Sequence, residues 1–114
     1  MRSAAILCLV LALSGCAGGL RSKEEAEQLV PADIAYKMTR DQWPSWYEDF
    51  GAPRISQISA EQRPAAIRAA REPKCDSVES LAMDRSTPTD IGFDVDCKNG
   101  QRIRIYETDL RSVS

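Results

Sequence analysis

Apolar and polar residues alternate in two segments near the end of the chain, residues 91–97 and 102–107. A period of two residues is typical of β-strands that bury one face. Asn99-Gly100 lies between the segments and predicts a hairpin turn. A two-residue turn would pair apolar with charged residues, whereas a three-residue loop with Gly100 in the left-handed conformation pairs like with like. We therefore expect these cross-strand pairs: Val95 with Ile103, Phe93 with Ile105, Asp96 with Arg102, and Asp94 with Arg104.

A third strand is expected from about residue 77 to residue 84, with a loop at 85–89 that turns the chain back. Cys75 and Cys97 lie equally far from Ser86 in the sequence. An antiparallel pair centred on Ser86 would place the two cysteines opposite each other, at the Cα separation of about 5.5 Å that a disulfide needs. The sheet is then a three-stranded antiparallel meander.

The segment before the sheet is rich in helix signals. Ser22 and Glu25 form a capping box, which predicts a helix from about residue 23. Pro31 either ends or kinks this helix. Apolar residues continue the helical spacing to about residue 41, namely Ile34, Ala35 and Met38.

Residues 59–72 predict another helix, because Ser59 and Gln62 make a weak capping box and an Ala-rich stretch follows. Pro64 could instead mark the first turn of a later start. Basic residues give this helix a charged side that would meet anionic lipid, an acidic partner or solvent alone: Arg63, Arg68, Arg71 and Lys74. The fold class that follows is α+β, with N-terminal helices packed on a three-stranded antiparallel β-meander stapled by one disulfide.

Four aromatic residues recur at helical spacing between these helices: Trp43, Trp46, Tyr47 and Phe50. The spacing i, i+3, i+4 and i+7 puts all four on one face of a short helix. Pro44 suits the first turn of that helix and Gly51 its end. The aromatic face is either a platform for a glycan, peptide or partner helix, or a layer that covers the sheet as core. We favour the core, because a small domain needs large side chains inside.

The first sixteen residues have the order of a secretory leader. One positive charge in residues 1–3 precedes an apolar run, residues 4–13, that is shorter than the about 20 residues needed to span a bilayer. The run ends in Leu13-Ser14-Gly15-Cys16, which resembles the lipobox of bacterial lipoproteins. The alternative is an ordinary secretory signal with a chance cysteine.

The lipobox resemblance implies an anchored envelope protein. Residues 1–15 would be a cleaved signal peptide, Cys16 would carry a diacylglyceryl group, and residues 16–22 would tether a single domain, residues 23–114. Such a protein inserts in a membrane through its lipid and faces the periplasm. Ala17 follows the cysteine where an Asp would retain the protein in the inner membrane, so a Gram-negative source would favour the outer membrane.

Cysteine usage agrees with an oxidising compartment. Once Cys8 is assigned to the leader and Cys16 to the anchor, Cys75 and Cys97 remain as an even pair. A disulfide closing this loop is worth about 3 kcal/mol. The spacing is not that of a Cys-x-x-Cys redox enzyme, and the absence of His excludes a Cys/His zinc site.

Composition then narrows the function. The chain has 114 residues, enough for one domain, and a formal charge of -2, which disfavours nucleic-acid binding. Without His the common hydrolase triads are unavailable. Four acidic residues near the end are more simply surface partners of arginines than an acid–base pair: Asp94, Asp96, Glu107 and Asp109. We expect a non-catalytic lipoprotein without metal or cofactor that binds another envelope component, or alternatively a small ligand-binding module that uses the aromatic face.

Overall fold

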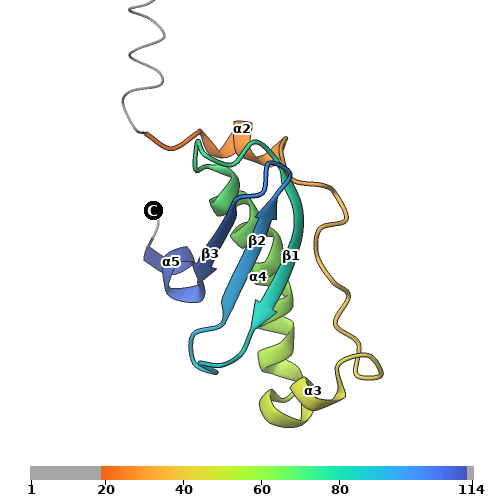
Figure 1. Ribbon diagram of the computed structural model, residues 1–114. Helices are drawn as coiled ribbons and strands as arrows, with labels where there is room; N and C mark the ends of the chain where they lie inside the picture. The colour runs from red at the N-terminus through yellow and green to blue at the C-terminus, as the bar shows by residue number, and fades with distance from the viewer. Residues whose placement is uncertain (1–18, 113–114) are drawn as a thin grey trace, which may run out of the picture.

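The computed structural model describes residues 19–112, so the leader and Cys16 lie outside the described residues. A three-stranded antiparallel sheet in the order β1-β2-β3 packs with one face on the long helix α4 (Figure 1). The predicted α+β class is confirmed. The elements follow in the order α2 (Lys23–Glu27), α3 (Pro44–Phe50), α4 (Ala52–Ala70), β1 (Val78–Asp84), β2 (Gly92–Cys97), β3 (Arg102–Tyr106) and α5 (Glu107–Ser112).

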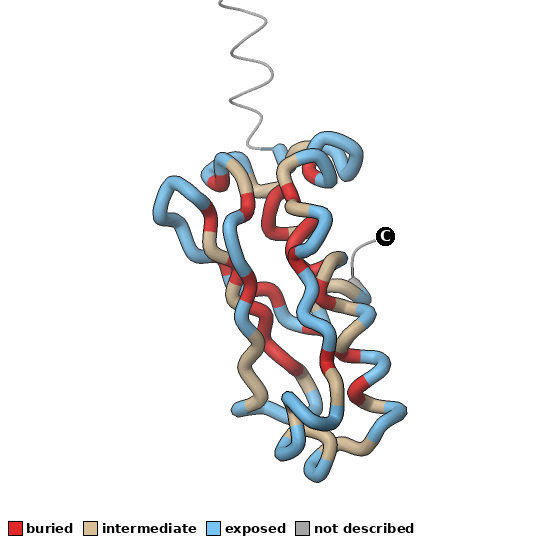
Figure 2. Tube along the Cα trace, turned by 90° about the vertical axis from the view of Figure 1, so that its right-hand side faces the viewer, coloured by how far each residue is buried: buried red, intermediate tan, exposed pale blue. Residues whose placement is uncertain are grey.

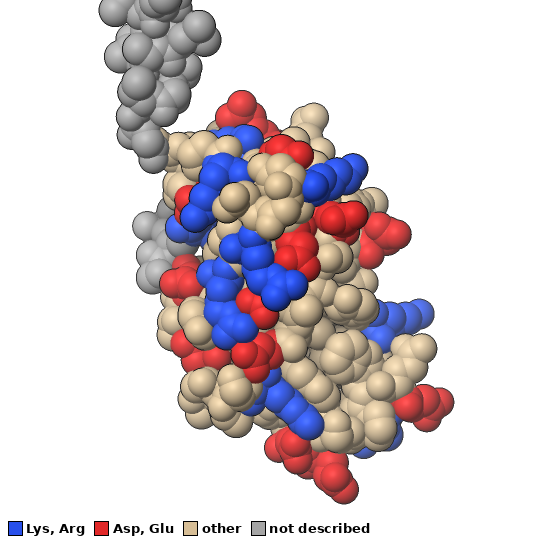
Figure 3. Space-filling model, in the orientation of Figure 1, with Lys and Arg blue, Asp and Glu red and all other residues tan. Residues whose placement is uncertain are grey.

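The β2–β3 hairpin has the predicted register in all four pairs. Gly100 has a φ of 94°, and the Cys97 amide donates to the Gln101 carbonyl across the three-residue loop. The apolar side chains of both strands are buried, and Figure 2 shows the buried positions where the sheet and α4 face each other. The opposite face carries the Asp–Arg pairs, which form a charged patch over the sheet (Figure 3).

The predicted disulfide is present, but the predicted strand register around it is wrong. Cys75 and Cys97 are bonded with a Cα separation of 5.6 Å. Cys97 pairs in the ladder with Val78, and Cys75 precedes the strand. Because Met83 pairs with Phe93, the ladder is centred on residue 88 rather than on residue 86, and the register shifts once more between Val78 and Ser80. The disulfide therefore joins the last paired residue of β2 to the chain just before β1.

Helix α4 starts seven residues before the predicted position. Gly51, with a φ of 82°, ends α3 and turns the chain directly into α4, where Pro53 occupies the first turn. Proline is tolerated there because the first amides of a helix have no helical partner. Pro64 lies inside the helix on its exposed side. The buried side of α4 is made of Ile55, Ile58, Gln62, Ala65, Ala66, Ile67, Ala69 and Ala70.

The predicted helical continuation to residue 41 is wrong. Helix α2 ends at Glu27, and the chain between Pro31 and Trp43 is irregular. Gln62 of α4 replaces the missing helical bonds: its Oε1 accepts from the Tyr36 amide at 2.7 Å and its Nε2 donates to the Tyr36 carbonyl at 3.0 Å. Of the three apolar residues that suggested the helix, Ile34 and Met38 are buried and Ala35 is exposed. The spacing of the two buried residues reflects contact with the core and not a helix.

Arg21, assigned by sequence to the tether, is bound into the fold. Its amide donates to the Arg71 carbonyl at 2.7 Å. Its Nη1 donates to three carbonyls around the end of α4, those of Ala70, Glu72 and Cys75. The Ala70 carbonyl is one that the end of the helix leaves without a helical partner, so Arg21 caps α4 and also holds the turn that follows it.

Candidate binding site

The four predicted aromatic residues lie at the end of the molecule where α4 begins. Helix α3 packs on α4 rather than over the sheet (Figure 1). All four rings touch the edge of the core, yet each is only partly buried. The face is therefore not the core layer that we favoured. Helix α4 covers the apolar face of the sheet instead. The buried residues of that face in β2 and β3 include Phe93, Val95, Ile103 and Ile105.

Four rings form a continuous strip, which we call the aromatic strip: Tyr36, Trp43, Trp46 and Phe50. Successive ring centroids are 5.8, 5.4 and 5.6 Å apart, and the two indoles meet edge to face at 90°. These separations are those of favourable aromatic pairs. Tyr36 is 45% exposed, and the sequence pattern predicts it within a helix and not beside the tryptophans. The strip joins an irregular segment to α3.

Tyr47, the remaining predicted residue, has a structural role. Its hydroxyl donates to the Met38 carbonyl, which fastens α3 to the irregular segment. The Arg40 guanidinium lies 4.6 Å from the centre of its ring. Tyr47 therefore holds the helix in place but lies outside the chain of ring contacts that makes the strip.

Arginines flank the aromatic strip. The Arg85 guanidinium lies 5.3 Å from the centre of the Trp46 ring and 2.8 Å from an Asp49 carboxylate oxygen. Arg54 lies 5.9 Å from the centre of the Phe50 ring. A guanidinium within about 6 Å of an aromatic face is attracted to it. These contacts hold the ring faces and the cations together at one surface.

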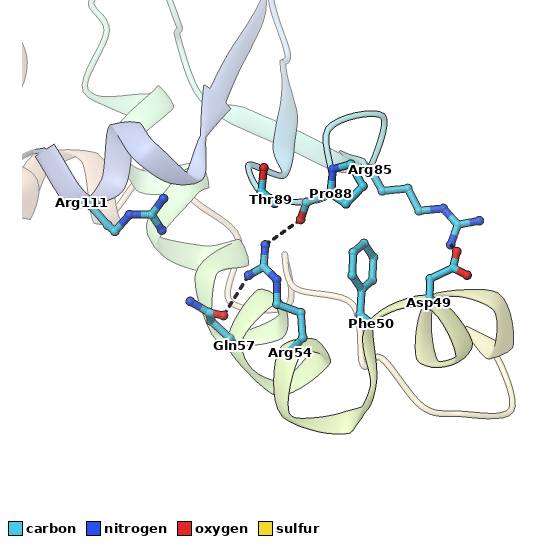
Figure 4. A pocket seen from close by; sticks show the side chains of 8 residues that line it. All are labelled: Asp49, Phe50, Arg54, Gln57, Arg85, Pro88, Thr89 and Arg111. Atoms are coloured by element: carbon cyan, nitrogen blue, oxygen red, sulfur yellow. Dashed lines mark hydrogen bonds and ion pairs between the residues drawn. The ribbon is translucent and has the colours of Figure 1, made fainter.

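An open groove of about 680 Å³ adjoins the strip at Phe50 (Figure 4). We call it the Phe50 groove; it is lined by Asp49, Phe50, Arg54, Gln57, Arg85, Pro88, Thr89 and Arg111. Its walls come from α3, α4, α5 and the loop between β1 and β2. The lining holds three arginines and one carboxylate, and two of the arginines are paired, Arg54 with Glu107 and Arg85 with Asp49. Of the four predicted aromatic residues, only Phe50 reaches it.

A buried carboxylate positions Arg54 in this groove. The Glu107 side chain is 0% exposed, and both of its oxygens accept from Arg54, at 2.7 and 2.6 Å. The Ile91 amide donates to the same carboxylate at 2.7 Å. Burial opposes ionisation of Glu107, but the hydrogen bonds from Arg54, Glu61 and Ile91 lower its pKa. Glu107 is thus a structural anion.

Glu61 is the neutral partner of Glu107. Burial is the main cause that raises the pKa of Glu61 to about 8, and the hydrogen bond to Glu107 acts in the same direction. The Arg54 and Arg111 charges oppose this shift. Glu61 therefore holds its proton at neutral pH and donates it to Glu107. Neither Glu61 nor Arg54 was singled out by sequence, because neither belongs to a local motif.

The four acidic residues near the chain end have different partners. Asp94 and Asp96 pair with Arg104 and Arg102 as predicted. Glu107 does not make such a surface pair, because it begins α5 and turns inward to α4. The fourth, Asp109, accepts a hydrogen bond from the Tyr106 amide at 2.8 Å.

Comparison with protein-family models, with curated proteins and with solved structures finds no match to this chain. Among residues 19–112, no helix combines the length and the apolar character required to cross a membrane. The same residues contain no group of three or more His, Cys, Asp or Glu side chains able to hold a metal ion. The function of the candidate site is therefore inferred from the geometry of its own residues.

Proposed function

We propose that the chain is a non-catalytic, lipid-anchored envelope protein that binds another envelope protein through the aromatic strip. The observation that carries this proposal is the strip itself, in which two rings belong to α3, Trp43 precedes that helix directly, and all four rings remain at least partly exposed. Aromatic side chains are enriched at protein interfaces and supply much of their binding energy. Tryptophan and arginine, which meet here at Trp46 and Arg85, are the commonest anchors.

The position of the strip suits a partner that stands away from the membrane. Helix α4 has 19 residues, which corresponds to a length of about 28 Å. The aromatic strip lies at its first end and Arg21 caps its last (Figure 1). A lipid on Cys16, five residues before Arg21, would hold the last end at the bilayer. The strip would then face the periplasm.

The Phe50 groove favours a second candidate function, a small ligand-binding module. Its volume of about 680 Å³ lies within the range of about 300–1,000 Å³ found for ligand sites. An anionic ligand there would meet Arg111 and compete with Asp49 for Arg85, since guanidinium groups bind carboxylate and phosphate through paired hydrogen bonds. Both Nη atoms of Arg54 are already bonded to Glu107, Gln57 and Pro88. In this case the ligand would contact Phe50 but not the indoles, which do not line the groove.

The experiment is a pull-down of the detergent-solubilised protein from its own cells, comparing wild type with Trp46→Ala. We expect a specific envelope protein to be captured by wild type and lost with Trp46→Ala. Tyr106→Ala is the matched control, because Tyr106 is an exposed aromatic residue on the charged face of the sheet. Circular dichroism checks that each variant folds.

The outcomes separate the two candidates. A partner retained by Trp46→Ala, or lost equally with Tyr106→Ala, contradicts binding through the strip. If no partner is captured while a carboxylate or phosphate ligand binds wild type and not Phe50→Ala, the ligand module replaces the protein-binding role.

A further inference from the structure

A second groove, of about 810 Å³, lies between α2, α4 and α5. We call it the basic groove; it is lined by Lys23, Glu27, Ala60, Arg63, Pro64, Ile67, Arg68, Arg71 and Leu110. Four of these residues are cations and one is an acid. The sequence shows no polybasic run here, because folding brings Lys23 beside arginines some 40 or more positions later.

The cations of the basic groove have donors left over for a ligand. Arg63 uses one N–H for the Pro31 carbonyl, and Arg71 uses its Nε for the Arg21 carbonyl. Arg68 is 3.3 Å from a Glu72 oxygen through Nη1, while its Nε is buried without a hydrogen-bond partner in the structure. Because each guanidinium carries five N–H donors, further donors remain on all three arginines.

Part of the lining of the basic groove is apolar, which suits a ligand with both a charge and an apolar part. Ile67, Ala60 and Leu110 lie among the cations. A phospholipid at the bilayer surface presents this combination, with a phosphate above the first methylene groups of its chains. An acidic peptide would satisfy the charges but would not require the apolar part of the lining.

The basic groove lies close to the predicted anchor. Arg21 is fixed to the end of α4, and the chain from Cys16 to Arg21 spans five residues, which reach at most about 18 Å. Lys23 follows two residues later and lines the groove. A lipid on Cys16 therefore keeps the groove near the headgroups, whatever path the tether takes.

We propose that the basic groove binds the headgroups of anionic phospholipids, and so sets the orientation of the domain on the membrane. This inference rests on the proposed lipid anchor and adds to it a second, electrostatic contact with the bilayer. Basic residues held near an anionic surface each add to membrane binding, and a lipid chain combined with a basic patch anchors more firmly than one chain.

The test uses the protein purified from its own cells and reconstituted in vesicles, with amine acetylation followed by mass spectrometry. Lys23 is the reporter and Lys37, outside the groove, is the reference lysine. We expect acetylation of Lys23 to be slowed at least about fivefold in vesicles containing phosphatidylglycerol relative to phosphatidylcholine alone, the factor that one favourable charge contributes. Lys37 should be acetylated equally in both.

Variants locate the effect in the basic groove. Arg63→Gln with Arg68→Gln should abolish the protection of Lys23. Arg40→Gln with Arg102→Gln removes the same charge outside the groove and should retain it. In wild type, raising salt from about 0.1 M to about 1 M should also abolish protection, since the screening length falls from about 10 Å to about 3 Å. The salt measurement tests electrostatic binding by the groove in wild type, even where the groove variant fails to fold.

Three results would overturn the proposal: equal acetylation of Lys23 in both kinds of vesicle, protection retained by the groove variant, or equal protection by inorganic phosphate with neutral vesicles. The last would make the groove a site for free phosphate. Flotation with neutral vesicles tests the anchor separately. If the protein fails to float there but Lys23 is protected by anionic vesicles, the anchor is wrong and the groove proposal stands.

Discussion

Glu61 and Glu107 show how environment separates two identical side chains. Glu107 faces Arg54 and the Ile91 amide, so it remains ionised although it is fully buried. Glu61 lacks such donors, and one of its oxygens is buried without a hydrogen-bond partner in the structure. Two adjacent carboxylates repel each other, so the pair shares one proton. The proton lies on the residue with the poorer set of donors.

This shared proton predicts a stability that falls as pH rises. Glu61 has a pKa of about 8 in the folded protein against 4.5 as its ordinary value, so its contribution is complete below about pH 4.5 and lost by about pH 8. The Glu107 contribution is lost only at acid pH, because its pKa is lowered. The melting temperature should therefore decrease between pH 5 and 8. Glu61→Gln, which keeps a neutral donor, should flatten that decrease.

Thermal unfolding at a series of pH values gives the slope of the melting temperature against pH. Glu79→Gln is the control, since Glu79 is an exposed glutamate on β1 and should leave the slope as in wild type. A Glu61→Gln variant with the wild-type slope would show that another group is responsible.

At the scale of elements, the parts that sequence predicts are those fixed by neighbours in the chain. The pairing of Val95 with Ile103 follows from alternation and a short loop, and both can be read locally. The helical spacing of Ile34 and Met38 was misread because Gln62, 26 positions after Tyr36, decides the backbone there. The Arg54–Glu107 pair spans 53 positions and has no local signal. For the same reason the Phe50 groove was not predicted.

Gln62→Leu tests the role of Gln62 in holding the segment between Pro31 and Trp43. The substitution leaves the Tyr36 amide and carbonyl without their partner, which should lower the free energy of unfolding by about 1–3 kcal/mol. Trypsin should then cut faster after Lys37 and Arg40. Gln57→Leu, on the exposed side of α4, is the control and should be cut at the wild-type rate. Unchanged cutting of Gln62→Leu would assign the segment to other contacts.

The disulfide fixes the start of β1 to the end of β2. Replacing both Cys75 and Cys97 by Ser should cost about 3 kcal/mol, because the bond closes a loop of 22 residues in the unfolded chain. Denaturant unfolding with and without a reductant measures this cost. The reductant should destabilise wild type and leave the double variant unchanged. If both unfold at the same denaturant concentration without reductant, the bond contributes no stability.

At the scale of the whole molecule, the fold separates two surfaces that the sequence intermixes. Lys23 and the aromatic residues lie within some 30 positions of one another, yet α4 places them toward opposite ends (Figure 1). The sequence pattern predicts both the aromatic face and the basic side of α4, but the favoured position of the aromatic face over the sheet is wrong. The placement of both surfaces depends on the packing of α3 and α2 on one helix.

Cys16→Ser tests the anchor that the lipobox resemblance implies. The variant should lose incorporation of radiolabelled palmitate and should partition with soluble proteins or remain as an uncut precursor. Cys8→Ser is the matched control, because Cys8 lies in the predicted signal peptide and should leave labelling intact. Labelling of the Cys16→Ser variant would contradict the assignment.

The contacts of Arg21 also determine how the domain would carry mechanical load. Arg21 bonds the carbonyls of Ala70 and Glu72 at the end of α4 and that of Cys75, which is covalently joined to Cys97 in β2. Tension between an anchored Cys16 and a partner held at α3 would therefore enter at Arg21 and run along the axis of α4, while the disulfide transmits it to the sheet. Helix α2 follows Arg21 in the chain and lies outside this path. A pull in this direction would load many hydrogen bonds at the same time. The fold would resist it because the elements would not detach one after another.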